Sequence, residues 1–447
     1  LASMATYQDS PAYGATFVNT YGIEKFIELP ISVYWHYTKY TGQRAAGYGD
    51  YRADTEAIDK ANGILAHLLA GATQTEKVPD GFDSWADALY ETSTVKGHRG
   101  RVSCLNELLS ASNAVYDTST LVNLATKMES QDSSNGGYYD GDPASRTPDQ
   151  ISGWHDAGYG NFYNEGRAFP GGHMDPMYGV MVAMGNNPEA AVEYLTPEGD
   201  GSVDGNGVWV PGQTTVDRWA MLTSRDWDPD CGLDSFTSVL GAASSFRNRA
   251  PSETDPDVSA TADARATYAC GRAMSYFGGE GFTKKDFTDT MKRNLAVVAA
   301  NSSQDVSTVA EDGALGADAT SAGLAATDIA SLIYRFGDNQ DAMTTLATGL
   351  GQYHHNAIQE AMNDPDANEN GLRYGYRQAA ASSSYLQTLS ELRFADDKKK
   401  DSEEQKTTVD TSLSVLNAVG AAGLTALTDG AAAPCSLSPR ARPLPSP

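Results

Sequence analysis

Apolar residues recur every three or four positions through most of the chain, which is the period of a helix that buries one face. The runs at 58–69, 121–128, 329–336 and 343–357 show this period most clearly. The pattern predicts a mainly α-helical protein, a bundle-like assembly of many helices with long glycine-rich loops and no substantial sheet.

The stretch at 170–243 contains several predicted helix starts. Asp175 should cap a helix whose first residue is Pro176, because a carboxylate accepts the free N–H groups of a first turn and proline has no N–H to lose. Asn187 and Pro188 repeat the arrangement a few residues later. Two helices should therefore meet at a tight corner, around which the rest of the chain is organised.

Further helix starts are predicted from N-capping residues and from the spacing of apolar residues. Thr120 and Thr283 stand where N-capping residues are expected, ahead of apolar residues at helical spacing. Near the beginning of the chain, the spacing of Tyr13, Phe17 and Tyr21 predicts a short helix.

Two segments, 132–172 and 196–213, lack a helical period and are rich in glycine, aspartate and asparagine. Both are predicted to be loops. Long loops within a folded domain often carry function, so these are the two places where a site is expected.

The composition divides the chain into six regions. They are 1–4, interpreted as a cloning remnant; 5–131, an N-terminal helical region; 132–172, a glycine- and tyrosine-rich loop insertion; 173–395, a central and C-terminal helical core; 396–433, a charged and then alanine- and glycine-rich helical segment; and 434–447, a proline- and serine-rich tail expected to be disordered.

The chain is strongly acidic, with 32 Lys and Arg against 58 Asp and Glu and a formal net charge of −26. This charge repels nucleic acid, so no nucleic-acid role is expected. The cysteines are Cys104, Cys231, Cys270 and Cys435, and no pair has the CxxC spacing of zinc or redox sites. Cys104 and Cys270 are expected to be small core residues, whereas Cys231 could pair in an oxidising compartment.

Membrane insertion is not expected. The segment 413–433 has small and apolar residues on one helical side, but polar residues such as Asn417 and Asp429 leave it short of the roughly 20 apolar residues that a span needs. It is predicted to dock on the preceding helices. The start of the chain lacks the pattern of a signal peptide, which leaves secretion by a signal-peptide-independent route and a cytoplasmic location both open.

The sharpest enzymatic hypothesis is a divalent metal site. His155 and Asp156, and His173 and Asp175, lie at the two ends of one glycine-rich stretch and offer the nitrogen and oxygen ligands that such ions take. Their spacing fits no strong motif, and Asp175 already has a role as a helix cap. This metal-dependent hydrolase is the alternative hypothesis, and no other cofactor is expected.

Other candidate ligands have weaker patterns. Calcium could bind at 200–207 or at 366–371, but position twelve counted from Asp366 is Arg377 rather than the closing glutamate of an EF-hand. His354 and His355 are adjacent and would point about 100° apart on a helix, with His354 expected to be half-buried and His355 solvated.

Several short motifs resemble large helical actinobacterial proteins of unknown function that accompany type VII secretion and polymorphic toxins. The matching pieces lie at 9–13, 172–176, 186–188 and 225–227, followed by the charged helix before the alanine- and glycine-rich segment. The resemblance covers most of the chain and implies a helical fold, but it brings no activity and no catalytic residues. The tail from Pro434 departs from the pattern.

The leading hypothesis is therefore a non-enzymatic helical scaffold or partner-binding module of a secretion- or toxin-linked actinobacterial system. It implies one or more protein partners and leaves the oligomeric state open.

Overall fold

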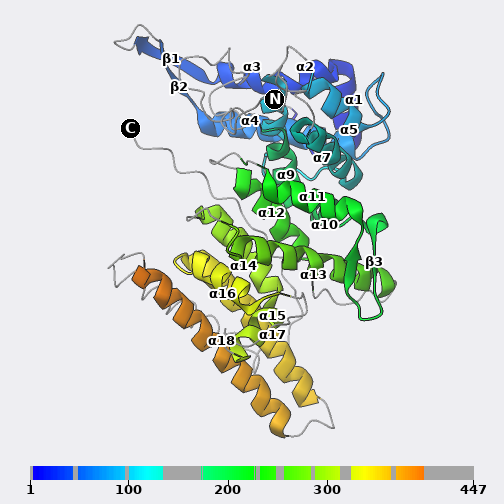
Figure 1. The fold of residues 1–447 in the computed structure, drawn as a ribbon. Coiled ribbons are helices and arrows are strands. Elements are labelled where there is room, and N and C mark those ends of the chain that lie inside the picture. The colour runs from blue at the N-terminus through cyan, green and yellow to red at the C-terminus, as the bar shows by residue number, and fades with distance from the viewer. Residues whose placement is uncertain are drawn as a thin grey trace.

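The fold comes from a computed structural model, which describes residues 4–43, 49–95, 100–133, 173, 175–225, 227, 232–247, 256–282, 287–312, 324–363 and 369–396. Over these residues the protein is mainly α-helical, as the hydrophobic period predicts. Figure 1 shows the helices following one another from the N-terminal elements at one end of the molecule to α17 and α18 at the other.

In the N-terminal part, the first and fourth helices cross at very close range. The elements are α1 (Pro11–Tyr21), α2 (Ile23–Ile27), α3 (Leu29–His36), β1 (Thr38–Gln43), β2 (Gly49–Ala53), α4 (Thr55–Thr73), α5 (Trp85–Ser93), α6 (Gly100–Leu109) and α7 (Thr118–Ser133). Helix α1 packs on α4 through Gly14, where a Cβ atom would collide with the Leu68 carbonyl oxygen. A residue without a side chain is needed for this close crossing.

The central part is built around a buried helix. The elements are α9 (Pro176–Gly185), α10 (Pro188–Leu195), a 3-10 turn (Glu198–Asp200), β3 (Gly201–Val203), β4 (Trp209–Pro211), α11 (Gln213–Ser224) and α12 (Gly232–Ser244). Helix α9 contacts α6 and α7 on the N-terminal side and α12 on the C-terminal side. It therefore joins the N-terminal part to α12.

The C-terminal part is a stack of longer helices. They are α13 (Pro256–Gly278), α14 (Asp289–Asn301), α15 (Ser303–Asp312), α16 (Ala326–Phe336), α17 (Gln340–Asn363) and α18 (Glu369–Asp396). Helix α14 packs between α12 and α17, and α18 packs on α15, α16 and α17.

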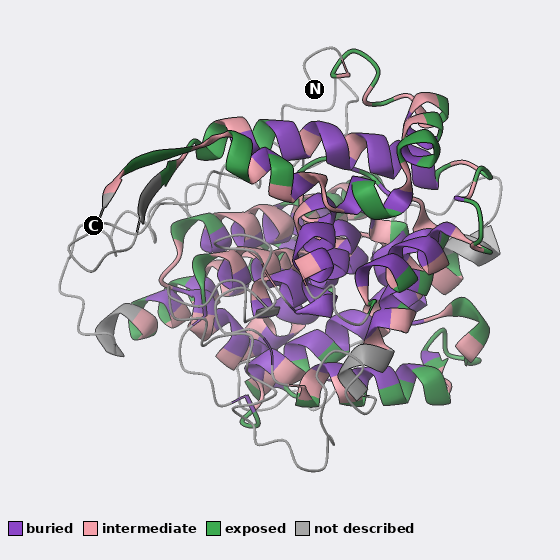
Figure 2. Cartoon of the chain, turned by 90° about the horizontal axis from the view of Figure 1, so that it is seen from above, coloured by how far each residue is buried: buried purple, intermediate pink, exposed green. Residues whose placement is uncertain are grey.

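One continuous hydrophobic core runs through all three parts, from Ala15 in α1 to Leu386 in α18. Figure 2 shows buried residues concentrated on the helices in the interior of the molecule, with exposed residues on the outer faces and on the coloured part of the β1–β2 hairpin. The burial of these apolar side chains is the main term that stabilises the arrangement.

The strands are short and peripheral. β1 pairs with β2 and β3 with β4, each as an antiparallel two-stranded ribbon, which agrees with the prediction of no substantial sheet. The predicted loop at 196–213 is partly wrong, because it contains the 3-10 turn and the β3–β4 ribbon. Trp209 explains the ribbon, since its side chain is buried while Val210 points outward.

Some predicted helix starts are confirmed and others are wrong. Asp175 and Asn187 cap α9 and α10 as predicted. Helix α7 begins before Thr120, and the Asp117 side chain accepts the Thr120 N–H. Thr283 lies outside the described residues, and α14 begins later than predicted, capped by Thr288.

Two further predictions concern parts of the chain that the structure describes only in part. Residues 132 and 133 belong to α7. The rest of the predicted 132–172 loop lies outside the described residues, and the description resumes at His173. The segment 413–433 lies outside them as well. No described helix is long and apolar enough to cross a membrane.

Candidate functional site

The start of α9 is fixed by its capping residue. Asp175 is fully buried, and its Oδ1 accepts the Met177 N–H at 2.9 Å. Pro176 takes the first helical position, where the missing N–H leaves no bond unmade. The local sequence therefore favours a helix start at Pro176.

A buried arginine holds the same carboxylate from its other side. Arg225 Nη2 donates to Asp175 Oδ1 at 2.9 Å and Nη1 donates to Oδ2 at 3.2 Å. The guanidinium lies 4.1 Å from the centre of the Trp227 ring, which stacks on Phe236 and donates its Nε1–H to the Leu222 carbonyl at 2.9 Å. Two hydrogen bonds and an aromatic face compensate both buried charges.

Asn106 of α6 braces the backbone at this point. Its Nδ2 donates to the carbonyl oxygens of His173 and Asp175, each at 2.8 Å, and its Oδ1 accepts the Gly179 N–H at 3.0 Å. One amide side chain thus satisfies three backbone groups, because asparagine carries both donors and acceptors. The entry of the chain into α9 is held by α6 on one side and by Arg225, at the end of α11, on the other.

His173 and Asp175 are the two members of the predicted metal site that the structure describes. The His173 ring is half-buried and lies 4.1 Å from the Tyr178 ring, centre to centre, while Asp175 is occupied by the helix cap and Arg225. His155 and Asp156 lie outside the described residues. Within the described part of the chain, no group of three or more His, Cys, Asp or Glu residues is placed to hold a metal ion. Convergence of the four residues stays a prediction.

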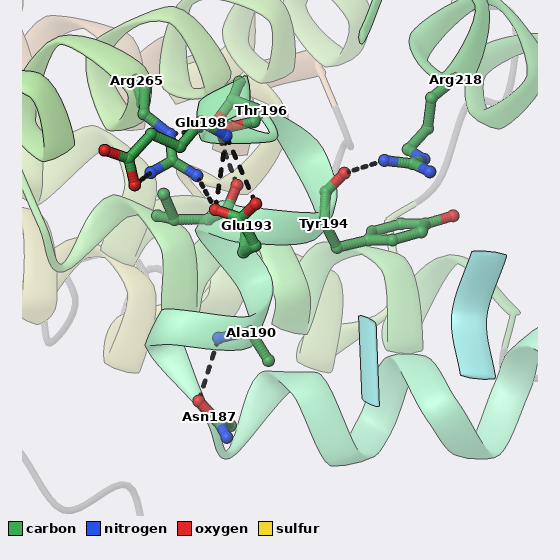
Figure 3. A network of polar contacts seen from close by, with 9 residues as sticks. Asn187, Ala190, Glu193, Tyr194, Thr196, Glu198, Arg218 and Arg265 are labelled. Atoms are coloured by element: carbon green, nitrogen blue, oxygen red, sulfur yellow. Dashed lines mark hydrogen bonds and ion pairs between the residues drawn. The ribbon is translucent and has the colours of Figure 1, made fainter. Parts of the chain in front are cut away.

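A second buried arginine holds the far end of α7. Arg218 Nε donates to Glu129 at 2.5 Å, its Nη1 donates to the Tyr194 carbonyl at 2.6 Å, and its Nη2 donates to Thr126 at 3.2 Å. Its guanidinium also lies 4.4 Å from the centre of the Tyr194 ring (Figure 3). Burial raises the pKa of the Tyr194 phenol well above its usual value, so this ring stays neutral beside the ion pair.

Both arginines belong to the same short stretch of chain, since Arg218 lies in α11 and Arg225 directly follows it. Seven residues of helix span about 10 Å along the axis. Glu129 lies near the end of α7 and Asp175 at the start of α9, so the two ends of the segment 134–172 are anchored to one helix. We call these four residues, Glu129, Asp175, Arg218 and Arg225, the stem clamp.

A third arginine extends this polar layer toward the β3–β4 ribbon. Arg265 of α13 donates its Nε to the Thr196 carbonyl at 2.6 Å, forms an ion pair with Glu193, and lies 3.7 Å from Glu198 (Figure 3). These contacts fix the end of α10 and the chain that leads into the ribbon. Backbone carbonyls at a helix end are natural partners for such a cation.

The weaker calcium candidate at 200–207 has a structural role in the described chain. The Asp200 carboxylate accepts the N–H groups of Thr214 at 3.2 Å and Thr215 at 2.6 Å, and so caps α11. Asp204 accepts the N–H groups of Asn206 and Val208 in the turn between β3 and β4. At 366–371, residues 366–368 lie outside the described residues.

Some of these residues have a signal in the sequence and others have none. Arg225 and Trp227 belong to a motif that carries the resemblance to helical actinobacterial proteins, but the motif does not reveal their contact with Asp175. The seven-residue spacing of Arg218 and Arg225 would place both on one helical face, and this is the signal that could have revealed the clamp. Asn106 has no such signal, because its partners lie about 70 residues away in the chain.

A family model described as "Family of unknown function (DUF6571)" matches residues 1–439. The chain belongs to the DUF6571 family. The match takes in every described helix, the stem clamp and the beginning of the tail, so clamp and core are parts of one family domain. No curated protein and no solved structure matches the chain.

Proposed function

We propose that this DUF6571 protein is a non-enzymatic helical scaffold that binds a protein partner through the glycine-rich segment 134–172. The stem clamp carries this proposal. It anchors the chain on both sides of one long glycine-rich segment to a single helix through the buried Asp175–Arg225 pair and the Glu129–Arg218 pair, in which the arginine is buried and the glutamate half-buried.

Buried ion pairs are an expensive way to join helices, because both charges lose their hydration. Apolar side chains of similar size would stabilise the core equally well or better. Placing two such pairs at the base of one segment is therefore better explained by the need for a defined base than by stability. Binding residues are often carried by loops that a rigid scaffold positions.

The proposed setting is a secretion- or toxin-linked actinobacterial system. Its support is the resemblance of the short motifs, among which 172–176 and 225–227 contain both residues of one clamp pair. The net charge of −26 favours a protein partner over nucleic acid. A basic surface on that partner would speed the association.

The test removes the segment and keeps the clamp. A variant in which residues 136–170 are replaced by a six-residue Gly-Ser linker should keep the helical circular dichroism spectrum, since the clamp contacts of Glu129 and Asp175 do not involve the segment. Tagged wild-type and shortened proteins are then used to capture partners from an actinobacterial lysate, and the captured proteins are identified by mass spectrometry. At least one protein should be enriched on the wild type and lost on the shortened variant.

A matched control shortens a different glycine-containing loop. Replacing residues 44–48, between β1 and β2, with Gly-Gly should leave capture of the same protein unchanged. Equal capture by wild type and the 136–170 variant would show that the segment is not the binding surface.

A further inference from the structure

Helix α18 rests on the body through a narrow and largely polar face. Its buried side chains within the described part of the chain are Ser382, Leu386 and Ser390, spaced four residues apart, and Leu386 is the one large apolar residue among them. Tyr385 and Leu389 pack beside them while partly exposed. So little buried apolar surface leaves the docking of α18 dependent on specific polar contacts.

The first of these contacts is at the beginning of α18. Glu311, near the end of α15, accepts hydrogen bonds from Tyr374 at 2.8 Å and Gln378 at 3.0 Å and forms an ion pair with Arg377. Burial acts to raise the pKa of Glu311, but the hydrogen bonds from Gln378, Arg377 and Tyr374 outweigh it and hold that pKa below its usual value. The contact requires an ionised carboxylate.

The second contact is in the middle of α18. His354 of α17 is 2% exposed, and its Nε2 lies 3.0 Å from the Ser382 hydroxyl. Burial lowers the pKa of His354 from 6.5 to about 4. The imidazole is more deeply buried than the sequence predicts, and its burial favours the neutral form.

The third contact is near the end of α18. Asp338, which follows α16, pairs with Lys292 at 2.7 Å and with Arg393 at 3.5 Å, and Ser390 donates to the adjacent Gly337 carbonyl at 2.8 Å. This contact anchors the end of α18. The first two contacts, at Glu311 and His354, weaken when protons are added.

We propose that α18 is an acid-released helix, which detaches from α15, α16 and α17 when Glu311 and His354 take up protons while the rest of the protein stays folded. The direction of the pH dependence follows from the linkage between proton binding and the docking of α18. Because the docked state favours neutral His354, docking is at full strength above pH 6.5 and weakens as the pH falls toward 4. Protonation of Glu311, whose pKa is held below its usual 4.5, weakens docking further at the acid end of this range.

The titratable and charged groups on the helices packed around His354 do not reverse the direction of this pH dependence. Tyr353 is next to His354 on α17, and Tyr385 is one turn from Ser382 on α18. Asp305 of α15 is paired with the buried Arg247, and Lys292 of α14 is paired with Asp338. Burial is thus the cause of the His354 shift, and the two nearby tyrosines stay neutral between pH 4 and 7.5 since burial raises their pKa values.

Amide hydrogen exchange measured by mass spectrometry on the full chain tests the proposal. After correction for the intrinsic pH dependence of exchange, protection of α18 peptides should fall roughly 30-fold between pH 7.5 and 5.0, as linkage gives for a group shifted from 6.5 to about 4. Protection of α4 should stay constant. All six tryptophans precede residue 228, so tryptophan fluorescence should also stay constant.

Adjacent histidines provide a matched pair of variants. His354→Gln cannot titrate and should reduce the α18 response to less than threefold, whereas His355→Gln, in the more exposed neighbour, should keep it near 30-fold. An unchanged response in His354→Gln, or joint loss of protection in α4 and α18, would overturn the proposal. If His354→Gln does not fold, the wild-type profile decides, because a fall confined to pH below 4 would exclude the imidazole.

Discussion

At the scale of single residues, the molecule repeatedly buries an arginine against one carboxylate. Arg225 with Asp175, Arg218 with Glu129 and Arg247 with Asp305 each form such a pair, and all three arginine side chains are less than a tenth exposed. A buried pair adds little net stability over an apolar replacement, but loss of one partner leaves an isolated charge in the core. These pairs therefore define geometry more than they raise stability.

Substitution of Asp175 tests the cost of leaving a buried arginine without its carboxylate. Asp175→Asn keeps an acceptor for the Met177 N–H but leaves Arg225 buried without a counter-charge, so the free energy of unfolding in urea at pH 7 should fall by about 3–5 kcal/mol. Asp200→Asn makes the same change at the half-buried cap of α11, where no arginine is paired with the carboxylate within the described part of the chain, and should lower it by about 1 kcal/mol or less. Similar losses in both variants would mean that Asp175 acts as a cap only.

At the scale of elements, α9 depends on a close crossing with α6. A Cβ atom at Gly179 would stand 2.6 Å from the Asn106 Cα, while the Gly179 N–H donates to Asn106 Oδ1. The glycine thus permits both the packing distance and the hydrogen bond that braces the start of α9. Neither contact is visible in the hydrophobic pattern of either helix.

A methyl group added at Gly179 should therefore destabilise the protein. Gly179→Ala should lower the free energy of unfolding by about 1–3 kcal/mol, because the backbone of α6 must move away. At Gly205, in the β3–β4 turn, a methyl group would meet open space, so Gly205→Ala should change stability by less than about 0.5 kcal/mol. Chemical denaturation of both variants provides the measurement, and equal values would show that α6 adapts without strain.

The start of a helix can be predicted from the sequence where a local capping residue determines it. The caps of α9 and α10 follow from a polar residue directly ahead of a proline, and both predictions are confirmed. The predicted start of α14 at Thr283 is too early, because a second threonine further along meets the same local rule. Thr288 also donates to Asp234 of α12, a tertiary contact that the sequence cannot reveal.

The candidate site is less predictable than the fold. The sequence marks His173 and Asp175 as possible ligands, yet the charge facing Asp175 comes from Arg225, 50 residues further along the chain. Periodicity reports which face of a helix is buried, but it does not report which helices become neighbours. The predicted aromatic spacing in α1 shows the same limit, since Tyr13 and Phe17 are half-buried and the fully buried positions are Ala15 and Val18.

At the scale of the whole molecule, the core is continuous from α1 to α18, and α9 packs between α6 and α7 of the N-terminal part and α12 of the central part. Met177, Met181 and Met184 are all fully buried along it. Methionine adapts its shape to irregular gaps, which suits a helix packed on several sides. Weakening α9 should consequently loosen distant parts of the chain together.

Met181→Ala puts this coupling to the test. The substitution leaves a cavity in the centre of the core and should lower the free energy of unfolding by about 2–5 kcal/mol. Amide hydrogen exchange at pH 7.5 should then show faster exchange in both α4 and α14, which lie on opposite sides of α9 along the chain. The matched control is Met362→Ala, because Met362 is 51% exposed at the end of α17 and its truncation leaves no cavity. If Met181→Ala loosened α14 and left α4 fully protected, the N-terminal part would be a separate folding unit and the continuous core would not be a cooperative one.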